Sequence, residues 1–180
     1  MSFIIPSSSF EWISGFRKKY FTFIGIYTLS VAFCWFKILP LFLLWFLSLL
    51  IISFHDECES IQILREGNKS PHNFLLEKLY TNSTYLIILY LPLITINTIF
   101  NSDFLLINAF FVPTQIALLC FAICLKYSTY SPGKKPVANN IPLAIVAFAS
   151  SLPYLLPIPA LLAIVYFYIA KKNLKKYLND

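Results

Sequence analysis

The stretch HDECESIQILREGNKSPHNFLLEKLY, residues 55–80, is the one long polar interval in a chain that is otherwise rich in apolar residues. It contains both histidines, five of the eight acidic residues and three of the fourteen basic residues. The runs before and after it are long and apolar enough to be membrane spans. We therefore expect this interval to lie outside the membrane and to be the first place where a soluble partner would bind.

The composition of the whole chain predicts an integral membrane protein. Of its 180 residues, 58% are hydrophobic and 12% are charged, and the mean hydropathy is +0.72. A soluble domain carries about 25% charged residues. The length fits one domain, residues 1–180, with five or six spans of about 20 residues each. The net charge of +6 does not predict a nucleic-acid partner, because Lys and Arg gather at the inner ends of membrane spans.

The pattern of apolar runs predicts an all-α fold. Residues 1–19 are expected to contain an interfacial helix, because Ser8 and Glu11 have the spacing of a capping box and an aromatic segment follows them. The predicted spans are residues 20–36, 38–54, 84–100 and 104–125. Residues 137–170 are too many for one span and few for two, so we expect a C-terminal hairpin broken by Pro153, Pro157 and Pro159.

The placement of basic residues predicts the topology. With a cytoplasmic N-terminus and a hairpin at residues 137–170, thirteen of the fourteen Lys and Arg residues lie inside, and Lys37 alone lies outside. This bias favours six transmembrane helices, or five plus a re-entrant hairpin, with both termini cytoplasmic. The chain is rich in Ile, Lys, Asn and Phe, as products of AT-rich genomes are, and on that basis we expect a bacterial inner membrane, the plasma membrane.

Few residues in the chain have the spacing of a chemical site. His55 and Glu59 would share a helix face, but a solvated helix next to the membrane explains them better than a metal site does. Asn97, Asn108 and Gln115 lie inside predicted spans, where interhelical hydrogen bonds are the first interpretation and a substrate path is the second.

No Asp, Glu, Lys, Arg or His falls inside a predicted span, which argues against a proton-coupled carrier and against an enzyme that works within the bilayer. We expect no catalytic residue, no metal and no cofactor, and the four scattered glycines do not form an ATP-binding loop.

Within the polar interval, Ser70 and Pro71 predict the start of a new helix, with Ser as N-cap and Pro at the first helical position. The acids Glu57 and Glu59 precede an aliphatic pair, and Lys78 follows Pro71 by seven residues. This order resembles the inner loop of the membrane subunits of type-2 ATP-binding-cassette (ABC) transporters. The Pro-broken final hairpin and the lysine-rich end of the chain are also similar to that family.

The resemblance implies a permease subunit that docks on a separate ATPase subunit. Two membrane subunits, identical or different, would face each other around a path for the substrate. The expected docking residues are Glu57, Glu59, Leu64, Ser70, Pro71, Phe74, Leu75 and Lys78. The alternative is a small membrane scaffold or assembly protein, whose polar loop recruits a partner without transport.

Overall fold

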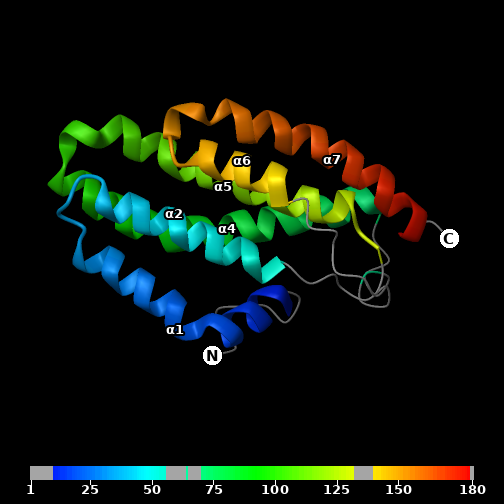
Figure 1. The fold of residues 1–180 in the computed structure, drawn as a ribbon, viewed down its shortest axis with the longest axis horizontal. Coiled ribbons are helices and arrows are strands. Elements are labelled where there is room, and N and C mark those ends of the chain that lie inside the picture. Colours follow the sequence, from blue (N-terminus) through cyan, green and yellow to red (C-terminus); the bar gives the residue numbers. More distant parts are fainter. Residues whose placement is uncertain (1–9, 56–63, 65–69, 132–139, 179–180) are drawn as a thin grey trace.

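The computed structural model describes residues 10–55, 64, 70–131 and 140–178, and every regular element among them is a helix (Figure 1). In chain order these are α1 (Phe10–Ala32), α2 (Leu39–Ile52), η1 (Ser53–His55), α4 (Pro71–Phe100), η2 (Ser102–Phe104), α5 (Leu105–Ser128), α6 (Asn140–Ser150), η3 (Pro153–Leu155) and α7 (Pro157–Leu178). The prediction of an all-α protein is confirmed for this part of the chain.

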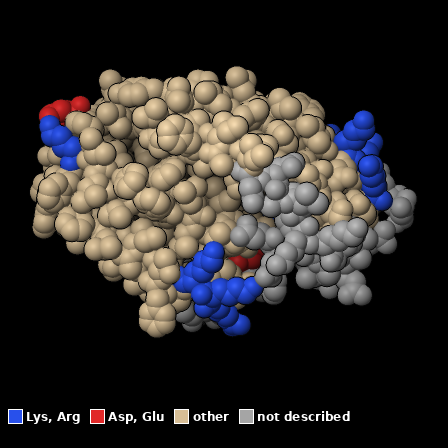
Figure 2. All heavy atoms as spheres, viewed as in Figure 1, with Lys and Arg blue, Asp and Glu red and all other residues tan. Residues whose placement is uncertain are grey.

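Three of the helical segments are long and apolar enough to cross a membrane. They are α4, α5 together with η2, and α7 together with η3, of 30, 27 and 26 residues. The surface is also strongly apolar: Phe21, Ile99 and Phe148 are 88%, 80% and 74% exposed. Figure 2 shows a broad area without charged side chains across the upper part of the molecule. Large exposed apolar patches mark surfaces that lipid or protein covers, and together with the three long apolar helices they are typical of a membrane protein.

The helices run back and forth between two ends of the bundle. At one end, Lys37 Nζ donates to Asp103 Oδ2 over 2.8 Å and joins the α1–α2 turn to the α4–α5 turn, at the left of Figure 1. At the opposite end, Asn173 Nδ2 donates to the carbonyl oxygens of Tyr127 and Tyr130, each over 3.1 Å, and ties the end of α7 to the end of α5. We call these the Lys37 end and the Asn173 end.

Helix α1 is divided at Lys19, whose φ of −125° and ψ of 24° are not helical. The ammonium group of Lys19 donates to Ser53 Oγ over 2.6 Å, so the break is held against the end of α2. The predicted interfacial helix corresponds to the first part of α1, while residues 1–9 lie outside the described part. Trp12 in this part is buried, and its ring contacts Phe54 and Tyr85. One side of it therefore packs into the bundle.

Helix α4 begins as the sequence predicts. Ser70 has an extended backbone, its Oγ accepts a hydrogen bond from the Asn73 amide over 3.3 Å, and Pro71 is the first helical residue. The helix then continues without interruption to Phe100, past Pro92. In the region of the predicted C-terminal hairpin, α6 and α7 lie on either side of the short helix η3 at Pro153.

Candidate functional site

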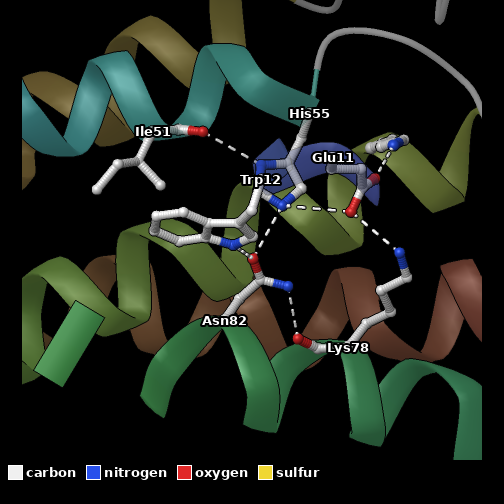
Figure 3. A network of polar contacts seen from close by, with 7 residues as sticks. Glu11, Trp12, Ile51, His55, Lys78 and Asn82 are labelled. Atoms are coloured by element: carbon white, nitrogen blue, oxygen red, sulfur yellow. Dashed lines mark hydrogen bonds and ion pairs between the residues drawn. The ribbon is translucent and has the colours of Figure 1, made fainter. Parts of the chain in front are cut away.

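A buried cluster of charged side chains lies where the start of α1 meets α4, α5 and η1 (Figure 3). Its centre is Glu11 in the first turn of α1. Lys126 near the end of α5 donates to Glu11 Oε1, and Lys78 in α4 donates to Oε2 over 3.0 Å. The imidazole Nε2 of His55 lies 3.5 Å from the same Oε2. One carboxylate thus connects three other elements of the chain.

Further hydrogen bonds around the Glu11 carboxylate hold His55 and the first turn of α1 in place. Trp12 Nε1 donates to Asn82 Oδ1 over 2.6 Å, and Asn82 Nδ2 donates to the Lys78 carbonyl over 2.7 Å. His55 Nε2 lies 3.0 Å from the same Asn82 oxygen, and its Nδ1 lies 3.2 Å from the Ile51 carbonyl (Figure 3). Both ring nitrogens therefore face acceptor oxygens, and a neutral ring can donate to only one of them.

Burial makes these contacts energetically important. The side chains of Glu11, Lys126 and His55 are 6%, 4% and 4% exposed, and that of Lys78 is 16% exposed. Removing one partner of a buried ion pair leaves a charge without compensation, which costs about 3–5 kcal/mol. Two ammonium groups at one carboxylate also disfavour a metal ion there. We therefore regard the cluster as a clamp that holds α1, α4, α5 and η1 together.

The clamp favours an ionised Glu11. Burial alone would raise the pKa of this carboxyl group, but the positive charges of protonated His55, Lys126 and Lys78 outweigh burial and hold it well below its usual value. Both lysines contribute to this direction through direct contact with the carboxylate. The cluster therefore keeps its central charge throughout the neutral and mildly acidic range.

We expect the clamp to weaken as the pH falls below about 6.5. Burial lowers the pKa of His55 below its ordinary value of 6.5, and Lys126 and Lys78 lower it further, although Glu11 and the Ile51 carbonyl oppose this. The unfolded chain then binds the proton more readily than the folded chain, so stability decreases as the pH falls through this window. The melting temperature in detergent should drop between pH 7 and pH 5, and His55→Gln should reduce the slope.

His72 provides the matched control, because it is the other histidine of the chain and is exposed at the start of α4 beside Phe167. His72→Gln should leave the pH dependence unchanged. A melting temperature that rises toward pH 5 would contradict the prediction, since it would mean that the fold prefers the imidazolium, which donates to both acceptors.

The structure places the predicted docking residues in different surroundings. Glu57 and Glu59 lie outside the described residues. Ser70 is exposed and caps α4, whereas Pro71 and Leu64 are buried. Leu75 is fully buried, Phe74 is half-buried with its ring against Tyr127, and Lys78 contacts Glu11. The apolar side of the start of α4 thus faces the bundle, and Leu75 packs inside this chain.

The outward side of the same turns carries other residues. His72, Leu76, Glu77 and Tyr80 are exposed there, with Leu76 46% and Tyr80 75% exposed. His72, Leu76 and Tyr80 follow one another at four-residue spacing, and Glu77 precedes Tyr80 by three residues, so the four lie on one side of the helix. The sequence pattern alone allowed either side of this helix to face the bundle.

The polar residues inside the predicted spans join helices. Asn97 Nδ2 donates to the carbonyl oxygens of Cys34 and Phe36, over 2.8 and 2.9 Å. Asn108 Nδ2 donates to Asn97 Oδ1 and Thr98 Oγ1, and Gln115 Nε2 donates to the Ser150 carbonyl over 3.1 Å. All three side chains are buried, and the oxygens Asn108 Oδ1 and Gln115 Oε1 have no hydrogen-bond partner among the residues that the structure describes. The contacts of Asn97, Asn108 and Gln115 are therefore hydrogen bonds that join different parts of the helical bundle, as the first interpretation expects.

Sequence reasoning missed the centre of the clamp. It assigned Glu11 to a capping box, but both carboxylate oxygens bind lysines, and Ser8 lies outside the described residues. It also assigned Lys126 to an inner loop, whereas this residue is in α5 and 5% exposed. The available signal was the lone acid in the first aromatic segment, because no basic residue lies three or four positions away from Glu11 to form a local ion pair.

No protein-family model, no curated protein and no solved structure matches this chain.

Proposed function

We propose that the chain is the membrane-spanning permease subunit of an ATP-driven, ABC-type transporter, and that it docks a separate ATPase subunit through the polar interval and the outward face of α4. The observation that carries this proposal is the continuity of α4. Its 30 residues run from the polar interval to the Lys37 end. At 1.5 Å per residue the helix is about 45 Å long, and a hydrocarbon core is about 30 Å thick, so its first turns extend beyond the apolar layer.

The clamp supports this function because it couples the start of α4 to the rest of the bundle. Lys78 is two turns into α4, and its partner Glu11 also binds Lys126 of α5. A force on the exposed face of Leu76 and Tyr80 would therefore act on α1, α4 and α5 together. A permease needs such a rigid connection, because its energy comes from a subunit outside the membrane.

For the topology we propose six crossings with both termini in the cytoplasm of a bacterial cell. The starts of α1 and α4 meet the ends of α2 and α5 at the clamp, and α7 ends beside α5. At the other end, Pro153 lies beside Ile38 and Phe104. Tyr130 and Pro153 thus lie toward opposite ends of the bundle, which supports a crossing between them, although α6 itself has only 11 residues, about 16 Å. The functional unit we propose contains two membrane subunits, identical or different.

The docking proposal predicts that Leu76→Ala combined with Tyr80→Ala lowers recovery of the ATPase by about tenfold, since truncating interface anchors costs more than about 1.4 kcal/mol. The measurement co-expresses the full chain with a candidate ATPase subunit and quantifies the ATPase that co-purifies. These two residues are exposed and outside the clamp, so the variant is expected to fold.

The matched control is Ile88→Ala combined with Leu91→Ala, which removes two exposed residues of the same helix within its apolar part, 61% and 53% exposed. Recovery of the ATPase should not change in the control. Equal recovery for both double variants would contradict docking through this face. Capture through the same face of a partner without ATPase activity would favour the scaffold.

A further inference from the structure

An apolar groove opens at the Lys37 end of the bundle, between α2, the start of α5 and the turn after α6. It has a volume of about 200 Å³. Its lining includes Ile38, Trp45, Phe104, Phe111 and Leu152. Two hydroxyl side chains also line it, Tyr154 and Ser151, and Ser151 donates to the Phe148 carbonyl. Ile38 to Trp45 and Phe104 to Phe111 each span seven residues, so the groove follows both helices for about 10 Å. Its lining suits a hydrocarbon chain.

Charged and aromatic side chains mark the mouth of the groove as the level of the lipid headgroups. Lys37 and Asp103, the neighbours of Ile38 and Phe104, form the exposed ion pair, and Lys37 Nζ lies 5.4 Å from the centre of the Phe104 ring. Trp35 and Tyr154 are exposed beside them. Trp and Tyr are enriched at membrane–water interfaces, where one side of the ring is apolar and the other is wet. The groove therefore leads from the interface into the apolar layer.

We propose that this groove binds one acyl chain of a phospholipid with a primary-amine headgroup, such as phosphatidylethanolamine. The negative phosphate of the lipid lies at Lys37, and its positive ammonium group lies at Asp103. The direct ion pair between Lys37 and Asp103 is thereby replaced by one contact from each residue to the headgroup. The proposal rests on the membrane location alone and is independent of transport and of the ATPase.

Two properties of the site select this ligand. The ion pair is exposed on both sides, with side chains 53% and 68% accessible, and exposed pairs contribute little to a fold, so opening it is easy. A primary ammonium offers three N–H donors to the Asp103 carboxylate, and such charge-assisted hydrogen bonds are strong. A quaternary choline offers none. A headgroup with only a phosphate would leave Asp103 repelled by the negative charge.

The test uses quenching of Trp45, which lines the groove. In Trp35→Phe, the remaining tryptophans are Trp45 and the buried Trp12 at the clamp. This variant is placed in phosphatidylcholine nanodiscs that contain a trace of lipid with brominated acyl chains. Brominated phosphatidylethanolamine should quench at a concentration about tenfold lower than brominated phosphatidylcholine, since hydrogen bonds to a charged group contribute about 1.5 kcal/mol or more.

Two further variants in the Trp35→Phe background test the two parts of the site. Asp103→Asn should remove the preference for the amine headgroup, and Ile107→Phe, which fills the groove, should remove the stronger quenching. Ile88→Phe on the exposed side of α4 is the control for added bulk, and it should change neither the headgroup preference nor the strength of quenching. Equal quenching by both lipids in the Trp35→Phe variant would show that Trp45 contacts only the bulk membrane lipid, and it would overturn the proposal. Absence of quenching by either lipid would show a protein over the groove and would also overturn it.

Discussion

Glu11→Gln should lower the free energy of unfolding in detergent by about 3–5 kcal/mol, the usual effect of breaking a buried ion pair from one side. Glutamine has nearly the same shape, so the change removes charge and leaves packing in place. Lys126 and Lys78 would then face an amide in an environment where the Lys126 side chain is 4% exposed. Unfolding by denaturant, followed by tryptophan fluorescence, measures the effect, since Trp12 is next to the mutated residue.

Asp103→Asn is the matched control, because the chain has a second ion pair of similar length in an exposed setting. Lys37 and Asp103 are 2.8 Å apart, as close as Lys78 and Glu11 at 3.0 Å, yet both are more than half exposed. This variant should show no measurable loss in detergent. Equal effects of Glu11→Gln and Asp103→Asn would contradict the idea that burial gives the clamp its strength.

Adding Lys126→Met to Glu11→Gln should recover about 1–3 kcal/mol, because the second change removes the charge that the first leaves uncompensated. Recovery would assign the loss to the ion pair itself. A double variant as unstable as the sum of the two single variants would instead mean that Glu11 and Lys126 contribute independently, and the clamp would not be one unit.

The local features of the fold were predictable from the sequence because neighbouring residues determine them. Ser70 and Pro71 start α4 as expected, since a hydroxyl cap and a first-turn proline act within one helical turn. The apolar runs predicted the regions that form α2, α4 and α5, and the prolines near residue 153 predicted the final turn. In each case the residues that predict a helix or turn lie within it or only a few residues away from it.

The clamp was not predictable because its partners are distant in the sequence. Glu11 binds Lys78 and Lys126, which are 67 and 115 residues away. At its own position Glu11 fits a capping box, so the local pattern offered a sufficient role and gave no reason to look for distant partners. The orientation of α4 shows the same limit, since Leu75 and Leu76 are adjacent, and only packing against α5 decides that Leu75 is buried and Leu76 exposed.

Gly15→Ala should destabilise the protein by about 1–3 kcal/mol, the range for an overpacked core. Gly15 lies in the first part of α1, and a Cβ atom built there would overlap the ring of Phe54 and come within 2.5 Å of its Cβ. The conflict involves the base of the Phe54 side chain, so a change of rotamer cannot relieve it. Phe54 precedes His55, and the strain should therefore also reach the clamp.

Gly25→Ala in the same helix provides a control with the opposite sign. No atom lies within 4 Å of a Cβ at this position, so the added methyl group meets open space. Replacing a helical glycine by alanine reduces the conformational entropy of the unfolded chain and stabilises by about 0.4–1 kcal/mol where the backbone is compatible. The two Gly→Ala variants should thus shift the unfolding midpoint in opposite directions. A loss of stability at both positions would indicate a general requirement for glycine in α1 and would contradict the prediction. A loss at Gly15 alone would show that α1 approaches the end of α2 closely at this residue. The position of Glu11, one turn earlier in α1, depends on this close approach.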